Sequence, residues 1–255
     1  MRRWPRPKVR LNHFLALAAG GSRREADGWI REGRVRINGA PPERIGVSVE
    51  PEKDRVTLNG SKVELPRERR YFAYHKPRGL LVSRRSQGGR RTIFDVLVAS
   101  IRGLHAVGRL DVESEGLILL TDDGALSEAL LHPRNALLRR YRVWVRPIPD
   151  PKMLRLLAAG TTVEGVPVKP ERITHEGADR GLGVLLIDLA EGKKREVRMM
   201  ARAAGLDVAR LIRIQFGSVR LDPLAPGAIR PLTRTEIDAL RRDAFPAPAP
   251  GARLR

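Results

Sequence analysis

Five carboxylates fall in one stretch, GRLDVESEGLILLTDDG, between Gly108 and Gly124. They are Asp111, Glu113, Glu115, Asp122 and Asp123. Carboxylates can act as nucleophiles or as general acids and bases, but Asp also recurs in ordinary turns. Turn chemistry accounts for the aspartates of TDDG, and we expect the two glutamates to be solvated. One alternative is that all five are turn or surface residues, and the other is that Asp111 performs chemistry.

Asp111 has the neighbours that suit a working carboxylate. Arg109 lies two residues before it, and glycines flank the segment so that its backbone can follow a tight, exposed path. A basic neighbour favours the ionised form of a carboxyl group. An ionised carboxylate can serve as a nucleophile or stabilise an oxocarbenium-like sugar cation, whereas a general acid needs an apolar pocket. The residues themselves therefore indicate a nucleophile or an electrostatic stabiliser.

Other kinds of active site are disfavoured by what the sequence lacks. It contains no cysteine, which excludes disulfides, thiolate catalysis and cysteine-bound zinc. Its five histidines include no HxxxH-type pair, and neither GxGxxG nor GxxxxGK[ST] occurs. We therefore expect no metal and no cofactor.

The composition points to a polyanionic partner. The chain has 255 residues, 49 of them Lys or Arg and 29 Asp or Glu, which gives a formal net charge of +20. A field of that sign attracts nucleic acid, although an arginine-rich composition with solvated faces is the structural alternative. No apolar signal core follows the basic start, and no apolar run has membrane-spanning length. We expect a soluble, cytoplasmic protein that does not enter membranes.

Residues 8–65 show the signals of a small separate module. Apolar residues at helical spacing end at Gly20-Gly21, and Ser22 with Glu25 forms the pattern of a capping box for a second helix. RVRING then alternates as a strand, and RVTLNGSKVEL reads as a hairpin that turns at NG. The charged, proline-bearing PRERRY at 66–71 predicts a linker.

The rest of the chain mixes strands and helices without strict alternation. GLILL, RRYRVWVR, GVLLIDLAEG and LIRIQFGSVRL have the pattern of strands, and TIFDVLVAS, ALSEALLH, DPKMLRLLAAG, KKREVRMMARAAG and TRTEIDALRRD that of helices. Such an order favours an α+β sheet domain. We place this domain at 72–244 and expect a disordered basic tail at 245–255.

Six segments, in the same order along the chain, resemble the RsuA/RluB/RluE/RluF-type family of rRNA pseudouridine synthases. RLNHFLALAAGGSRREADGWIREGRVRING resembles the S-four-like RNA-binding module of that family, and GRLDVESEGLILLTDDG resembles its catalytic motif. HKPRGLLVS, RRYRVWV, EGKKREVRMM and LIRIQFGSVRL followed by PGAIRPLT resemble its other motifs. The resemblance implies an S-four-like module plus a larger synthase domain with a mixed, mostly antiparallel sheet flanked by helices.

The resemblance also implies catalytic roles. Asp111 would be the nucleophilic aspartate, and Tyr141 would stack on the uracil and assist removal of the C5 proton. Arg198 would pair with Asp111, and Val197 would pack below the tyrosine. Arg109 would help to hold a flipped-out RNA. No redox step or group transfer is needed, so the absence of cofactor motifs is expected.

Basic residues of the motifs are the expected RNA contacts. They are Arg23, Arg24, Lys76, Arg109, Arg140, Lys193, Lys194 and Arg195. The chain departs from the usual family pattern at three positions: His75 replaces an Asn, Arg139 a Lys, and Met199 a second Arg. None is one of the expected catalytic residues, but Met199 could alter an RNA contact.

The implied reaction is isomerisation of a specific uridine in ribosomal RNA, with 23S-type RNA favoured. The alternatives are a 16S-type target, a non-catalytic rRNA-binding assembly factor, and a retaining nucleosidase or glycosidase. The last needs a second carboxyl group as acid, and we find none in a convincing apolar setting. Ribosomal RNA or an assembling ribosomal subunit is the expected partner, and a monomer the expected state.

Overall fold

A computed structural model describes residues 8–65, 68–98, 101, 104–163, 165–193 and 195–245. The chain divides into two compact units. The N-terminal unit comprises Met1–Arg70 with Leu97–His105, and the C-terminal unit comprises Tyr71–Val96 with Ala106–Arg255. The tail predicted at 245–255 falls almost wholly outside the described residues, as do two positions of the predicted linker.

The N-terminal unit contains two short helices and small sheets. Its elements are β1 (Val9–Arg10), α1 (Leu11–Ala19), α2 (Arg23–Arg31), β2 (Val35–Ile37), β3 (Ser48–Val49), β4 (Val56–Leu58) and β5 (Ser61–Lys62). β2, β4 and β5 form one sheet, and β1 pairs with β3. Its core lies between the helices and strands and consists of Leu11, Phe14, Leu15, Ala26, Ile30, Val35, Val49 and Val56.

Two local signals in this unit are confirmed. The Ser22 side chain accepts a hydrogen bond from the Glu25 backbone N–H at 3.2 Å, and the Glu25 carboxylate accepts one from the Ser22 backbone N–H, which completes the capping box. Asn59 and Gly60 have φ angles of 51° and 79° between β4 and β5. Those positive angles are what a two-residue hairpin turn requires.

The C-terminal unit is built on one large sheet. Its strands are β6 (Tyr71–Lys76), β7 (His105–Val107, at the unit boundary), β8 (Glu115–Thr121), β9 (Arg139–Arg146), β12 (Arg172–Asp179), β13 (Leu182–Leu189), β14 (Asp207–Phe216), β15 (Val219–Arg220) and β16 (Ile229–Pro231). The order is β12-β13-β9-β14-β8-β6-β16, with β15 on β14 and β7 on β8. β10 (Thr161–Val163) and β11 (Val166–Val168) form a separate pair.

The sheet is mixed and mostly antiparallel, as predicted. Along the main path, β14 and β8 form the parallel pair, with Ile212 opposite Glu115 and Arg213 opposite Gly116. The other neighbours on that path run antiparallel. The sheet therefore consists of two antiparallel halves, β12-β13-β9-β14 and β8-β6-β16, which are joined by the parallel pairing of β14 with β8.

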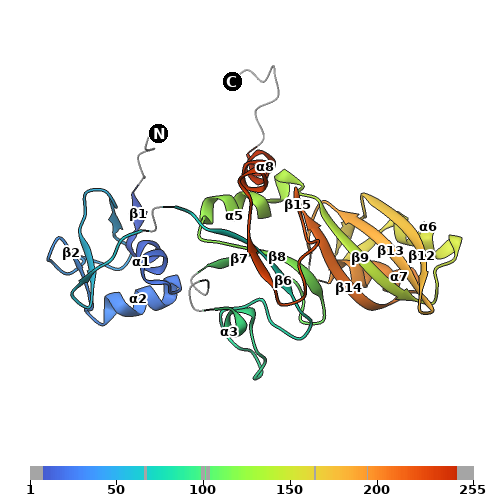
Figure 1. Ribbon diagram of the computed structural model, residues 1–255, viewed down its shortest axis with the longest axis horizontal. Coiled ribbons are helices and arrows are strands. Elements are labelled where there is room, and N and C mark those ends of the chain that lie inside the picture. The colour runs from blue at the N-terminus through green and yellow to red at the C-terminus, as the bar shows by residue number, and fades with distance from the viewer. Residues whose placement is uncertain are drawn as a thin grey trace, which may run out of the picture. The chain divides into compact units, whose positions relative to one another are not determined.

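Helices cover parts of this sheet (Figure 1). They are α3 (Ile93–Val96), α5 (Gly124–Leu131), α6 (Pro151–Ala159), α7 (Glu196–Ala203) and α8 (Arg234–Ala244), with a 3₁₀ turn at Pro133–Asn135. α5 lies beside α8, and α7 packs on β14. The helix predicted for TIFDVLVAS has one turn within the described residues, and the helix predicted for KKREVRMMARAAG begins at Glu196.

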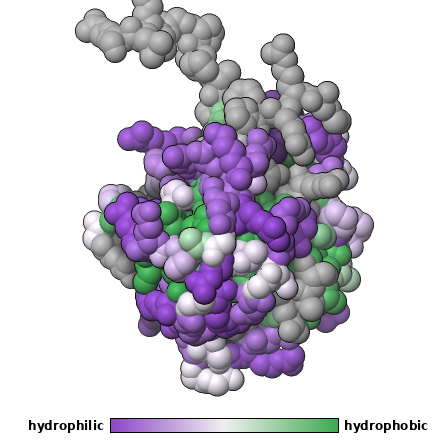
Figure 2. All heavy atoms as spheres, turned by 90° about the vertical axis from the view of Figure 1, so that its left-hand side faces the viewer, coloured by the Kyte–Doolittle hydropathy of each residue, from purple (hydrophilic) through white to green (hydrophobic). Residues whose placement is uncertain are grey.

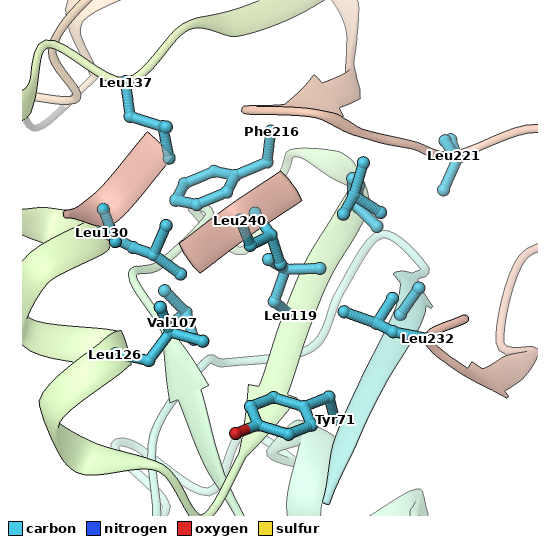
Figure 3. Close-up of a cluster of buried hydrophobic side chains, with 14 of the residues drawn as sticks. Tyr71, Val107, Leu119, Leu126, Leu130, Leu137, Phe216, Leu221, Leu232 and Leu240 are labelled. Atoms are coloured by element: carbon cyan, nitrogen blue, oxygen red, sulfur yellow. The ribbon is translucent and has the colours of Figure 1, made fainter. Parts of the chain in front are cut away.

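The main core lies under α5 and α8 (Figure 3). Leu126 and Leu130 of α5, Leu240 of α8 and Phe216 of β14 are each at most 2% exposed. Tyr71 joins this core, and its hydroxyl donates to Asp123 at 2.7 Å while Arg241 of α8 donates to that hydroxyl at 3.1 Å.

The face of the molecule shown in Figure 2 is largely polar. The face in Figure 2 carries mainly hydrophilic side chains with smaller hydrophobic areas between them, as expected for a chain in which 31% of the residues are charged. Within the described residues, none of the helices combines the length and the apolar character needed to cross a membrane.

Candidate active site

The three expected catalytic residues line one cleft of about 480 Å³ in the C-terminal unit. Asp111 comes from the loop between β7 and β8, Tyr141 from β9 and Arg198 from α7. These elements are distant in the sequence and become neighbours because β9 pairs with β14 and β14 with β8. Val197 of α7 lines the same cleft and is buried.

Hydrogen bonds from Lys76 fix the backbone around Asp111. The Lys76 ammonium donates to the carbonyls of Ser114 at 2.7 Å, Pro77 at 3.1 Å and Val112 at 3.4 Å. The Ser114 N–H also donates to the Asp111 carbonyl at 3.0 Å, which closes the turn. The carboxylate is thus carried on a loop that is fixed to the end of β6.

The prediction that Lys76 contacts RNA is wrong. Its side chain is 0% exposed, so it cannot reach a phosphate outside the protein. Burial lowers the pKa of Lys76 to about 8, and the nearby negative charges of Asp111 and Glu115 oppose that shift. The residue instead places a buried positive charge beneath the loop that carries Asp111.

The expected ion pair between Arg198 and Asp111 does not form. The Arg198 Nη1 donates to the Val208 carbonyl at 3.1 Å, and its Nε lies 3.8 Å from the Glu113 carboxylate. Burial lowers the pKa of Arg198, whereas the charges of Glu113 and Asp111 act in the opposite direction. Its Nε and Nη2 are buried without a hydrogen-bond partner. The prediction is wrong because Glu113 and a backbone carbonyl hold the guanidinium.

The two glutamates of the opening stretch are not simply solvated. Glu113 is half-exposed but pairs with Arg195 at 3.3 Å as well as with Arg198. Glu115 is buried at the start of β8, where Arg210 donates to both its oxygens at 3.0 and 2.9 Å. Those hydrogen bonds lower the pKa of Glu115 despite its burial. The solvated state predicted for Glu115 is therefore wrong, whereas Glu113 is exposed as predicted and also forms ion pairs.

Tyr141 and the buried side chains beside it on the sheet form the inner lining of the cleft, here called its floor. Tyr141 is 7% exposed and lies opposite Arg213 of β14. Arg139 and Arg213 are also buried, with their guanidinium carbons 5.2 and 5.0 Å from the centre of the Phe216 ring. Arg139, Arg213 and Phe216 all line the cleft, as Tyr141 does. Two buried guanidinium groups thus contact one aromatic ring in the same cleft as the tyrosine.

Sequence reasoning missed most of this floor. Arg139 was noted only as a departure from the family pattern, and Arg213 and Phe216 were not singled out. The available signal was the alternation of RRYRVWVR and LIRIQF, which places an arginine among the inward positions of each strand. An arginine at an inward position is rare unless it is paired or functional.

The loop before α7 brings further charge to the cleft. Lys193 and Arg195 line it, together with Arg109. Arg195 has a φ of 54°, and the Glu196 carboxylate accepts a hydrogen bond from the Lys193 N–H at 2.9 Å. Three of the expected RNA contacts therefore surround one opening, where their positive charge can attract a phosphate backbone.

Glu196 corrects another expectation. It is a buried carboxyl group that lines the cleft, and burial raises its pKa. The prediction that no second carboxyl group occupies an apolar setting is therefore wrong. One of its oxygens is engaged by the Lys193 N–H, and the other is buried without a partner.

The remaining expected RNA contacts lie elsewhere or cannot be placed. Arg140 projects from the opposite face of β9 to Tyr141 and donates twice to Asp188, at 2.6 and 2.7 Å. Arg23 and Arg24 are exposed at the start of α2 in the N-terminal unit. Cations are unfavourable at a helix N-terminus, which favours a function over a stabilising role. Lys194 lies outside the described residues.

The other two departures from the family pattern have structural accounts. His75 is buried in β6 with its Nδ1 2.7 Å from the Leu224 carbonyl oxygen. Met199 is 38% exposed on α7 and is not among the residues that line the cleft. Among the residues that the structure describes, no group of three His, Asp or Glu could hold a metal ion.

The site as a whole joins an accessible carboxylate to a positive, partly aromatic cleft. Such a cleft can attract a polyanion, accept a planar base against Tyr141 and present Asp111 to a sugar carbon. The same groups would fit a nucleosidase as well as a pseudouridine synthase, so the chemistry of the cleft leaves both possible.

Comparison with known proteins separates these possibilities. Residues 70–203 match the RNA pseudouridylate synthase family, and residues 9–51 match the S4 domain. An uncharacterized RNA pseudouridine synthase of Aquifex aeolicus is 38% identical over 91% of this chain and 94% of its own length. The ribosomal large subunit pseudouridine synthase B of Bacillus subtilis is 34% identical over 91% of this chain and 95% of its own.

A solved structure agrees. A crystal structure of a pseudouridylate synthase is 32% identical and covers 91% of this chain and 99% of its own, with a TM-score of 0.63. The matches cover both the N-terminal module and the unit that contains the cleft. The chain therefore belongs to the RNA pseudouridine synthase family.

Proposed function

We propose that the protein converts a specific uridine of large-subunit, 23S-type ribosomal RNA to pseudouridine, with Asp111 as the nucleophile. The observation that carries this proposal is the meeting of Asp111, Tyr141 and Arg198 in one cleft whose opening bears Arg109, Lys193 and Arg195. The choice of large-subunit RNA is supported by the names of the relatives from Bacillus subtilis and Yersinia pestis.

The reaction needs little more than these side chains. The bond from N1 to the ribose C1′ breaks, the base turns, and C5 bonds to C1′. C5 then loses its proton and N1 gains one, so the product is an isomer of the substrate. Asp111 supplies the negative charge that attacks or stabilises the sugar carbon. Arg198 adds positive charge beside it, shared with Glu113.

Tyr141 would hold the flipped base. Removing a base from its stack costs a few kcal/mol, and stacking on an aromatic ring returns roughly 1–3 kcal/mol. The low exposure of Tyr141 at the floor of the cleft suits such a platform. Its oxygen, in the phenolate form, would then lie beside the base and accept the C5 proton.

Affinity for RNA would come from two places. Arg109, Lys193 and Arg195 would hold phosphates around the cleft, and Arg23 and Arg24 would do so from the N-terminal unit. We propose that residues 8–65 act as a separate RNA-binding module joined by the linker at 66–71. We also propose that the protein acts as a monomer in the cytoplasm.

Tritium release from rRNA labelled at uridine C5 tests this function. The wild-type protein should release tritium from large-subunit RNA, and Asp111→Asn should lower the rate at least a thousandfold because an amide is not a nucleophile. The exposed Asp207→Asn at the start of β14 is the matched control and should retain the wild-type rate.

Three outcomes would contradict the proposal. Release from small-subunit RNA alone would move the target to the other subunit. RNA binding without any release by the wild-type protein would indicate an assembly factor. Free uracil as the product would indicate a nucleosidase.

A further inference from the structure

A buried arginine without an acidic partner lies in the floor of the cleft. Arg213 is 2% exposed, its Nε donates to the Leu117 carbonyl at 2.8 Å, and it lies against the Phe216 ring. Its Nη2 is buried without a hydrogen-bond partner. Within the described residues, Arg213 forms no ion pair with an acidic side chain. A guanidinium keeps its charge at any physiological pH, so an unpaired one is costly to bury.

Arg213 faces Tyr141 directly. The two residues are opposite each other in the pairing of β14 with β9, so their side chains project from the same face of the sheet. On the other side of β14, the position opposite Arg213 is Gly116, so β8 offers no side chain there. A Cβ at Gly116 would lie 2.4 Å from the Arg213 carbonyl oxygen, which shows how closely β8 holds this backbone.

The electrostatics of the pair support a functional link. Burial lowers the pKa of Arg213, and the interaction with the Tyr141 hydroxyl is the main influence in the opposite direction. The Tyr141 side chain is thus the main group that offsets the burial of the Arg213 charge.

Building on the proposed function, we propose that Arg213 is a positioning residue for Tyr141. It holds the phenol oxygen in place and stabilises the negative charge on that oxygen before the tyrosine takes the C5 proton. In that step the O–H bond forms and the C5–H bond breaks. The electron pair of the C5–H bond becomes the C5–C6 double bond, and N1 takes a proton from water. The phenol returns its proton to solvent before the next turnover, and Arg213 remains protonated throughout.

Other charged groups surround Tyr141 but are engaged differently. Besides Arg109, Lys193 and Arg195 around the opening, they are Arg139 on β9, Asp111 before β8, and Glu196 and Arg198 on α7. Arg139 donates to the carbonyls of Leu137 and Ala190, and Arg198 is held by Val208 and Glu113. The two acids would oppose a negative phenol oxygen rather than stabilise it. Arg213 is the cation that lies across from the tyrosine in the strand register.

The test compares pH–rate profiles of two Arg213 variants. Arg213→Met removes the charge and keeps much of the length, whereas Arg213→Lys keeps the charge without the planar group. Arg142→Met, on the exposed face of β9, is the control for loss of a basic residue. Each variant is assayed by tritium release on the same rRNA between pH 6 and 10, and its melting temperature is measured.

We expect a specific split of the kinetic parameters. For Arg213→Met, kcat at neutral pH should fall at least tenfold, KM should stay within threefold, and the profile should move about one unit to higher pH. Arg213→Lys should lie between this variant and the wild type. In a Tyr141→Phe background, Arg213→Met should leave cleavage of the glycosidic bond unchanged, since its partner is already absent.

Several results would overturn the inference. Unchanged kcat and pH profile in a folded Arg213→Met would do so, and so would a raised KM with normal kcat, which would make Arg213 an RNA contact. If Arg213→Met fails to fold, the test rests on Arg213→Lys. A lowered kcat of Arg213→Lys with an unchanged pH–rate profile would indicate only damage to the structure and would overturn the inference. Failure of the proposed function is distinguished by the wild-type protein, which would then release no tritium.

Discussion

Replacing Lys76 with methionine should change the pH dependence of stability more than stability itself. At pH 7 the substitution removes three hydrogen bonds to carbonyls, each worth about 1 kcal/mol. It also removes the cost of a buried charge. The lysine pKa is lowered from 10.5 to about 8, which corresponds to about 3 kcal/mol. These effects oppose each other, so the free energy of unfolding at pH 7 should stay within about 2 kcal/mol of the wild type.

The pH dependence has a definite sign. Below pH 8, Lys76 is protonated in both the folded and the unfolded chain, and the full cost of burial is present. Between pH 8 and 10.5 the unfolded chain binds more protons than the folded one, so the stability of the wild type rises with pH. By pH 9.5 the wild type should gain about 2 kcal/mol relative to Lys76→Met.

Urea unfolding at pH 7 and 9.5 measures this difference. In a Trp4→Phe and Trp29→Phe background, Trp144 of β9 alone reports on the C-terminal unit. Lys169→Met, at an exposed lysine of the same unit, is the control and should show no such change. A difference between wild type and Lys76→Met that stays constant within about 0.5 kcal/mol across this range would refute the reasoning.

The other predictions concern the cleft and the N-terminal module. Tyr141→Phe should still stack on the base but accumulate rearranged RNA that has not lost its C5 proton. Tyr141→Ala should lose both the stacking and the proton removal. Full activity of the Phe variant in the tritium assay would show that the hydroxyl has no chemical role. Gly116→Ala should cost about 3–5 kcal/mol of stability, since its Cβ would meet the Arg213 backbone. Gly181→Ala, with positive φ but open space, should cost about 1 kcal/mol in the same unfolding experiment. Removal of residues 1–65 should raise KM for an rRNA fragment and flatten its salt dependence with little effect on kcat, and loss of kcat in a folded truncation would place the module in the active site.

Many local features of the fold could be predicted from patterns of neighbouring residues. The capping box at Ser22 and the hairpin turn at Asn59 depend on contacts within a few residues, so the sequence shows them directly. The α+β class with a mostly antiparallel sheet followed from strand alternation and from the family resemblance, and it is confirmed. The family and the enzyme class are confirmed as well.

The failures share a physical cause, which is that partners distant in sequence decide the state of a charged side chain. Lys76 reads as a surface cation, but three carbonyls of the chain close over it. Arg198 was assigned to Asp111, yet Glu113 lies closer to it. Glu196 follows an ordinary helix pattern, and only the packed cleft reveals that it is buried.

The placement of β16 beside β6 has a consequence for the design of variants. These strands come from opposite ends of the C-terminal unit, and α8, which follows β16, donates from Arg241 to the hydroxyl of Tyr71 at the first position of β6. The unit therefore begins and finishes at one edge of its sheet. A circular permutant that joins residue 245 to residue 71 through a short linker, and opens the chain at the exposed turn Arg180–Gly181, would keep every strand pairing of the sheet. The proposed RNA-binding module could then be reattached at a new terminus. Comparing the two arrangements would separate the RNA affinity that the module adds by tethering from the affinity that depends on its position beside the C-terminal unit's substrate.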